Sequence, residues 1–265
     1  MCGRANPGLW GFGPILRQWG ADFGFVPIVV GGSAILYALT LLVSGSDLQV
    51  VGGGMMSFLV PSDAALLMFG MSGTLPVFGL GFWWTLLTAS WLHGNFLHIL
   101  FNMMWVRQLG PATADIVGPS RTVIIYTVAG VAGFLLSSVA GLVLGGLSIP
   151  FLQPAFRTVG ASASIFGLLG ALVHYGRKGG SSLIHAEALR YAVLLFVFGL
   201  IMPGIDNYAH AGGFLGGYAA SAVMNPLTRE RGDHLVIAIG CLVATFLAVV
   251  YSVFHVAPLI RAAVR

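Results

Sequence analysis

The sequence has little charge. Only 8% of its 265 residues are Asp, Glu, Lys or Arg, whereas 57% are hydrophobic. A soluble domain carries about 25% charged residues, so this chain cannot cover a globular surface with charge. It also lacks the alternation of apolar and polar residues that marks the strands of an outer-membrane barrel. These absences predict an all-α integral membrane protein that crosses the membrane several times.

Metal ligands and concentrated positive charge are also scarce. The two cysteines, Cys2 and Cys241, lie at opposite ends of the chain, so neither a disulfide nor a metal site is inferred from them. No H-E-x-x-H motif occurs, and the candidate histidines lack a clear carboxylate partner. The net charge of +4 comes from scattered basic residues that form no stripe. We therefore expect no metal, no cofactor and no nucleic-acid partner.

Long apolar stretches are what the sequence has instead. A membrane-spanning helix needs about 20 mostly apolar residues. Four stretches are clear candidates, and they are 26–44, 122–145, 160–176 and 235–254. Three more are shorter or more polar, and they are 94–110, 187–204 and 206–224. The sequence therefore predicts seven spans.

The placement of basic residues predicts the orientation of these spans. Cytoplasmic loops carry an excess of Lys and Arg. With the N-terminus inside, nine basic residues fall on the cytoplasmic side: Arg4, Arg17, Arg107, Arg121, Arg177, Lys178, Arg190, Arg229 and Arg231. Only Arg157, Arg261 and Arg265 then fall outside. We therefore predict an N-in, C-out protein. The N-terminus lacks the succession of charged, apolar and small-residue regions that marks a cleaved signal peptide.

A long segment, 45–92, separates the first two spans. It is apolar and rich in aromatic residues but is interrupted by Gly, Pro and Ser, a pattern that favours the membrane interface. We expect a structured external loop there. The predicted organisation is a cytoplasmic tail at 1–25, a six-helix core at 26–224, and a cytoplasmic loop with a seventh helix at 225–265.

A few polar residues fall within the spans, where hydrocarbon would leave them unsatisfied. His98 and Asn102 are four residues apart and share one helix face, Ser162 begins the fourth span, and His210 lies one turn inside the sixth. The second, fourth and sixth spans all run inward, so these side chains lie at a similar depth near the outer surface. Glycines after His210 would let the fourth and sixth helices pack closely.

This arrangement predicts a nucleophile with its base, although single residues allow other interpretations. His210 could take the proton of Ser162, while His98, Asn102 and the Ser162 N–H could stabilise an oxyanion. Taken alone, Ser162 is more often a packing residue that bonds to its own helix. Similarly, His210 could serve an ion path, and Asn102 could cross-link helices.

Three motifs identify a resemblance to the rhomboid intramembrane serine proteases, over residues 83–220. They are "HGNFLHILFNMMW" in the second span, "GASA" within "GASASIFGLLG" in the fourth, and "AHAGG" in the sixth. Each motif is weak alone, but their order on alternate spans is specific to the family.

The resemblance implies a six-helix core around a water-filled cavity that opens outward, here with one extra C-terminal helix. It implies Ser162 as nucleophile, His210 as general base, and His98 and Asn102 as oxyanion stabilisers, without a catalytic Asp or a cofactor. It further implies that 45–92 is the family's large first loop and that the fifth span is its lateral gate. The implied activity is an endopeptidase that cuts transmembrane proteins within the lipid bilayer, near helix-weakening and small residues.

Three positions depart from the family pattern. Ala163 replaces a glycine after the nucleophile, and Phe166 replaces the tyrosine that commonly stacks on the catalytic histidine. Trp83-Trp84 replaces a Trp-Arg pair, so a guanidinium that stabilises the first loop is lost. Phe166 could still support the base by stacking. His93 is expected to contact substrate or water at the cavity mouth, or to lie at the interface.

Other residues and functions compete with this interpretation. Asp206 is interpreted as a helix N-terminal residue rather than a third catalytic group. His174, His185, His234 and His255 are given no role. A catalytically silent relative that binds membrane clients is the alternative function, but such a protein is expected to lack the serine or the histidine. We expect a multi-pass protein of a prokaryotic cell membrane whose active site opens to the extracytoplasmic side.

Overall fold

Seven long helices make up most of the part of the chain that the structure describes. The structure, a computed structural model, describes residues 20, 22–50, 58–146 and 152–263. Its long helices are α2 (Phe25–Ser44), α5 (Phe96–Val117), α6 (Pro119–Leu144), α7 (Ser162–Arg177), α8 (Ser182–Ile201), α9 (Asn207–Met224) and α10 (Gly232–Ala263). Each predicted span overlaps one of them, so the all-helical class is confirmed. Within the described ranges, α2, α6, α8 and α10 are long and apolar enough to cross a membrane.

The helix boundaries follow local backbone chemistry. α8 begins five residues before its predicted start because the Ser181 hydroxyl accepts a hydrogen bond from the Ile184 N–H, 3.3 Å away. α5 does not end at residue 110 as predicted. It continues through Pro111 and ends before Gly118, whose φ of 102° suits glycine. The helix thus extends seven residues beyond the predicted span of 94–110.

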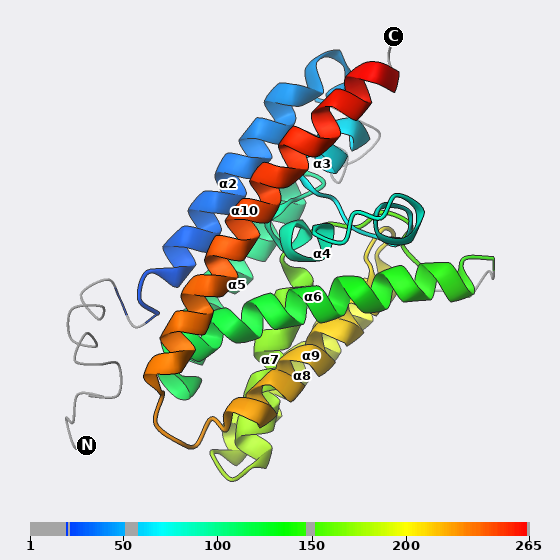
Figure 1. Ribbon diagram of the computed structural model, residues 1–265. Coiled ribbons are helices and arrows are strands. Elements are labelled where there is room, and N and C mark those ends of the chain that lie inside the picture. The colour runs from blue at the N-terminus through cyan, green and yellow to red at the C-terminus, as the bar shows by residue number, and fades with distance from the viewer. Residues whose placement is uncertain (1–19, 21, 51–57, 147–151, 264–265) are drawn as a thin grey trace.

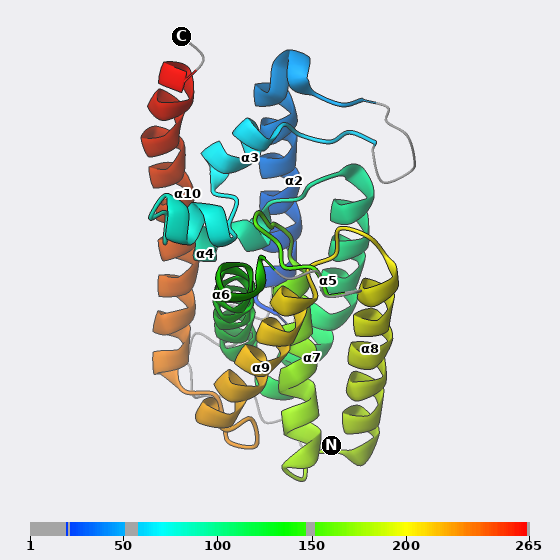
Figure 2. The ribbon, with the colours of Figure 1, turned by 90° about the vertical axis from the view of Figure 1, so that its right-hand side faces the viewer.

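α9 packs extensively against both α6 and α7, and glycines make this packing possible. Figure 2 shows α8 and α10 at opposite edges of the bundle, with α6, α7 and α9 between them. A methyl carbon on Gly213 would lie 2.7 Å from the Ala163 carbonyl carbon, and one on Gly217 would overlap the Gly167 backbone. On the other side, a methyl on Gly133 of α6 would lie 2.6 Å from the Ala209 oxygen. The helices therefore meet backbone to backbone.

The segment before α5 is a loop of short helical pieces, as expected, although residues 51–57 lie outside the described residues. It contains α3 (Asp63–Phe69), a π-helical turn (Leu75–Gly79), α4 (Thr85–Thr88) and a 3₁₀ turn (Ala89–Trp91). Ser72 and Thr158 exchange backbone hydrogen bonds of 3.1 and 2.8 Å. The Thr88 hydroxyl donates to the Gly70 carbonyl at 2.6 Å. These bonds fix the loop to itself and to the chain that leads into α7.

The linker between α9 and α10 is anchored at the start of α6. The Arg121 backbone N–H donates to the Glu230 carboxylate at 2.8 Å, so a residue distant in sequence caps this helix. The Arg121 guanidinium in turn donates to the carbonyls of Val117, Thr228 and Arg229 at 2.8 to 3.0 Å. Both charged side chains are buried.

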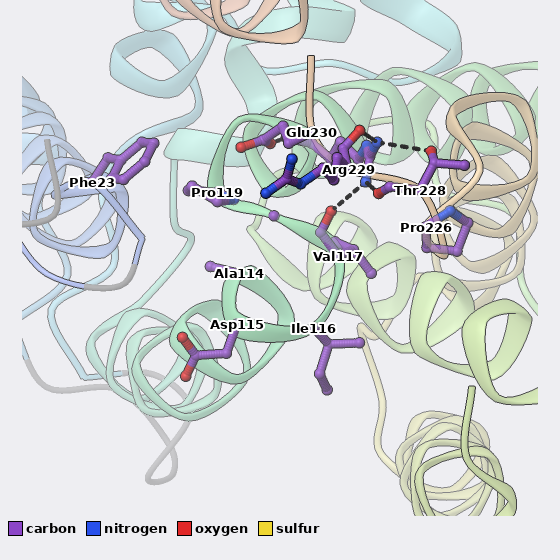
Figure 3. A pocket seen from close by; sticks show the side chains of 12 residues that line it. Phe23, Ala114, Asp115, Ile116, Val117, Pro119, Pro226, Thr228, Arg229 and Glu230 are labelled. Carbon is purple, nitrogen blue, oxygen red and sulfur yellow. Dashed lines mark hydrogen bonds between the residues drawn. The ribbon is translucent and has the colours of Figure 1, made fainter. Parts of the chain in front are cut away.

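A pocket of about 450 Å³ lies beside this anchor. Arg121 is among the residues that line it, and in Figure 3 Thr228, Arg229 and Glu230 gather on one side, opposite Asp115 and Ile116. Burial raises the pKa of Glu230 above its usual value of 4.5, although the Arg121 N–H and its positive charge oppose this shift.

The predicted tail at 1–25 is described only from residue 20 onward, without residue 21.

Replacing Gly213 with Ala should destabilise the protein, because the added methyl would overlap the Ala163 backbone. Overpacking of this kind costs about 1–3 kcal/mol. Thermal unfolding in detergent measures the loss. Gly240→Ala on α10 is the matched control, since a methyl there meets no atom within 4 Å. Equal stability of the two variants would contradict the backbone contact.

Glu230→Gln should change how stability depends on pH. A carboxyl whose pKa is higher in the folded protein than in the unfolded chain contributes stability at low pH, and this contribution is lost as pH rises. The melting temperature of the unmodified protein should therefore fall relative to Glu230→Gln as pH rises above about 4.5. Glu187→Gln, at a half-exposed ion pair on α8, is the control. A difference that grows in the opposite direction would show that burial does not dominate at Glu230.

Candidate active site

Ser162 and His210 meet where α7 and α9 begin. Ser162 is the first residue of α7, and His210 is the fourth residue of α9. The Ser162 Oγ lies 2.9 Å from the His210 Nε2, a normal hydrogen-bond distance. His210 is 5% exposed and Ser162 is half-buried. A hydroxyl and an imidazole in this relation can act as nucleophile and base.

The imidazole of His210 is oriented by packing. Phe166, one turn after Ser162 on α7, stacks on the ring with 4.3 Å between centroids and 18° between planes. If Ser162 donates to Nε2, the neutral ring carries its proton on Nδ1. That nitrogen is buried and has no hydrogen-bond partner among the described residues. An aromatic ring, and not a carboxylate, therefore holds the base.

Asp206 lies close in sequence to His210 but is engaged elsewhere. Its carboxylate accepts from the Ala209 N–H at 3.0 Å and from the Ser137 hydroxyl at 2.5 Å. The first contact makes it the N-cap of α9, which confirms the interpretation from the sequence. The second contact ties α9 to α6.

His98 on α5 faces the chain just before Ser162, and Asn102 lies one turn further along the same helix. The Gly94 N–H donates to the His98 Nδ1 at 3.4 Å, which leaves Nε2 as the protonated nitrogen of the neutral ring. That Nε2 faces Gly160, where a side-chain carbon would lie only 2.5 Å from it. Gly160 also has a φ of 132°, which residues with a side chain rarely adopt. Both the backbone conformation and the close approach of His98 therefore require glycine at this position. The Asn102 amide donates to the His98 carbonyl at 2.8 Å and retains a second N–H.

His93 is not placed as expected. It is fully buried, and its ring meets the His98 ring edge-on with 5.2 Å between centroids. A side chain at a cavity mouth or membrane interface would be exposed, so that expectation is wrong. His93 instead supports the position of the His98 ring.

A second Ser–His contact lies deeper along the same two helices. The His174 Nδ1 is 2.9 Å from the Ser221 Oγ, and both residues are buried. Sequence reasoning gave His174 no role, because nothing in its spacing from Ser221 indicates a contact between helices. The two pairs differ in their surroundings. Ser162 opens its helix, where the first N–H groups have no intrahelical acceptor, whereas Ser221 and His174 lie near helix ends that present carbonyls.

Ser162 therefore has electrostatic surroundings that the deeper pair lacks. The partial positive charge of a helix N-terminus falls at its own N–H and that of Ala163. Such donors stabilise an oxyanion that forms beside them. Ser164 faces away, because its hydroxyl lies 3.2 Å from the Ser90 hydroxyl.

Comparison with known proteins identifies the family of this chain. The curated relatives of this chain include the rhomboid protease GluP of Bacillus subtilis (strain 168), 30% identical over 179 residues that cover 66% of this chain and 32% of that protein. RHOMBOID-like protein 7 of Arabidopsis thaliana is 34% identical over 148 residues, covering 51% of this chain and 41% of that protein. The match thus spans less than half the length of either relative.

A shorter relative is covered more fully. The putative rhomboid protease YdcA of Bacillus subtilis (strain 168) is 30% identical over 146 residues, 53% of this chain and 67% of that protein. Residues 80–227 match the Rhomboid domain family, and this segment is more than half of the chain and contains Ser162, His210, His98 and Asn102. The chain therefore belongs to the rhomboid family, a family of multi-pass membrane proteins.

Proposed function

We propose that this protein is an intramembrane serine endopeptidase that hydrolyses peptide bonds in or near transmembrane helices of other membrane proteins. The observation that carries the proposal is the 2.9 Å contact between Ser162 and His210 at the N-terminus of α7. The names of the relatives GluP and YdcA, both called rhomboid proteases, support it.

The first half of the reaction forms an acyl-enzyme. The Ser162 Oγ attacks the substrate carbonyl carbon while the His210 Nε2 takes the hydroxyl proton. The negative oxygen of the tetrahedral intermediate faces the Ser162 N–H, the His98 Nε2–H and the second N–H of Asn102. When the C–N bond breaks, His210 gives the proton to the departing amine, and the acyl group stays on Ser162 as an ester.

The second half regenerates the enzyme. A water molecule attacks the ester carbonyl while His210 takes one of its protons. Collapse of the intermediate breaks the bond to Ser162, whose oxygen recovers the proton from His210, and the acid fragment leaves. During both halves the imidazole is transiently positive, and the Phe166 ring face lies against that charge.

The proposed arrangement has seven spans, with the N-terminus inside and the C-terminus outside. The polar site residues lie on α5, α7 and α9, while α2, α6, α8 and α10 are long and apolar enough to cross a membrane. In this orientation the dyad opens to the extracytoplasmic side of a cell membrane. The lipid bilayer is then both solvent and source of substrate.

Ser162→Ala and His210→Ala should each lower kcat by roughly 10⁴-fold or more, because nucleophile and base act as a unit. Cleavage of a transmembrane test substrate in reconstituted vesicles measures this loss. Ser221→Ala is the matched control, because it removes a serine with the same distance to a histidine on the same two helices. It should retain cleavage and labelling by a fluorophosphonate.

Cleavage by Ser162→Ala at the rate of the unmodified protein would overturn the mechanism. Retention of membrane clients without cleavage is the competing function. That function requires neither side chain, and it predicts that the unmodified protein is not labelled at Ser162.

Asn102→Ala should lower kcat by about 10²–10³-fold with little change in KM, because one oxyanion donor is lost. Gln108→Ala removes an exposed amide from the same helix and should leave both constants unchanged. The kinetic constants and the melting temperature are measured together. A loss confined to KM, or one that follows the melting temperature, would assign Asn102 a structural role only.

A further inference from the structure

α10 begins after the segment that matches the Rhomboid domain, which ends at residue 227. It packs against α6 and against the short loop helices α3 and α4. Figure 1 shows α10 running past α4 and α3 toward the C-terminus. The extra helix therefore reaches the loop that precedes α5.

Four aromatic rings join α10 to this loop, and together they form the aromatic cluster Phe82, Trp84, Tyr251 and His255. The Trp84 ring meets Tyr251 edge-on at 4.8 Å and His255 edge-on at 5.3 Å. Phe82 stacks on Trp84 at 4.7 Å and meets His255 edge-on at 5.6 Å. Tyr251 and His255, one turn apart, stack on each other. Each ring thus touches at least two others, in the geometries that aromatic pairs prefer.

A short covalent and hydrogen-bonded path leads from this cluster to the nucleophile. Trp84 directly precedes α4, and the turn after α4 begins at Ala89. The Ala89 carbonyl accepts a 2.9 Å hydrogen bond from the Gly160 N–H, two residues before Ser162. In the same turn, the Ser90 hydroxyl contacts that of Ser164, two residues after Ser162. The segment held by the cluster therefore contacts the chain on both sides of the nucleophile.

The sequence alone suggested that this loop is weakened, because Trp84 stands where the family commonly has an arginine. The structure shows what Trp84 contacts instead. Its ring is held between Phe82 on the loop and two rings of α10. At this sequence position, the Trp84 ring therefore contacts the extra helix, where the family commonly has a guanidinium.

We propose that α10 is a positioning element for Ser162, acting through the aromatic cluster and the Ala89–Gly160 hydrogen bond. The effect of this positioning on catalysis rests on the proposed function. The cluster fixes the loop against α10, the loop fixes Gly160, and Gly160 fixes both the entry of the chain into α7 and the face of His98. Trp84 and Tyr251 are positioning residues, because neither touches the reacting atoms.

The test compares Trp84→Ala and Tyr251→Ala with Trp84→Phe and Tyr251→Phe in the full chain. Each alanine variant should lower kcat by about tenfold to about a hundredfold with KM unchanged, since displacement of about 1 Å at a reacting group has an effect of this size. The phenylalanine variants retain a ring and should recover most of kcat. The double alanine variant should lose no more of its kcat than the worse single variant, since both substitutions disrupt the same aromatic cluster.

Phe254→Ala is the matched control, because this aromatic residue precedes His255 on α10 but is 77% exposed. It should retain full activity. Hydrogen exchange supplies the readout that a general loss of stability would not reproduce. The Gly160 amide should exchange faster in Trp84→Ala, while amides near His174 and Ser221 keep their protection.

Two results would overturn the inference. One is unchanged kcat in Trp84→Ala while the unmodified protein cleaves its substrate. The other is faster exchange spread equally along α7 and α9, which would indicate a merely structural role. If the unmodified protein neither cleaves nor is labelled at Ser162, the proposed function fails instead. In that case hydrogen exchange of the Gly160 amide still tests whether the aromatic cluster holds Gly160 in place. Equal exchange rates in Trp84→Ala and Phe254→Ala would reject that role.

Discussion

Glycine at positions 213 and 217 lets the backbone of α9 touch the backbone of α7, and the positions of the reactive atoms follow from that contact. Hydrocarbon gives helices no hydrophobic reason to associate, so close packing of small residues has to hold them together. The same closeness brings a short serine side chain within hydrogen-bond distance of a histidine on the next helix. Packing and chemistry at this site therefore have a single cause.

The surroundings of His210 show how an imidazole can be oriented without a carboxylate. A charge inside a membrane is costly. Asp206, the acidic residue nearest in sequence to the base, is engaged with the α9 N-terminus and Ser137. A phenyl ring stacked on the imidazole limits its rotation without adding charge. Loss of the tyrosine hydroxyl at Phe166 leaves this function of the ring in place.

Much of this arrangement could be predicted from the sequence. The apolar runs predicted the long helices of the described residues, and the common depth of Ser162 and His210 predicted that these two would lie close together. These features depend on local composition and on topology, both of which can be read from one chain. The N-cap role of Asp206 was likewise predictable from its position.

Contacts between distant segments could not be predicted in this way. Glu230 caps α6 from beyond α9, and Trp84 meets Tyr251 across more than 160 intervening positions. Only the three-dimensional path of the chain brings such pairs together. His93 was expected at the cavity mouth or at the membrane interface, but its side chain is fully buried. Its burial depends on the tertiary structure of the loop before α5.

The length of α7 has a consequence for where a substrate is cut. The helix has 16 residues and is therefore about 24 Å long. The hydrocarbon core of a bilayer is about 30 Å thick. With Arg177 and Lys178 at the head groups of one leaflet, Ser162 lies about 6 Å beneath the opposite boundary of the hydrocarbon. Under the proposed function, a peptide bond would then be drawn roughly one helical turn below the membrane surface, and the length of this one helix would set that depth.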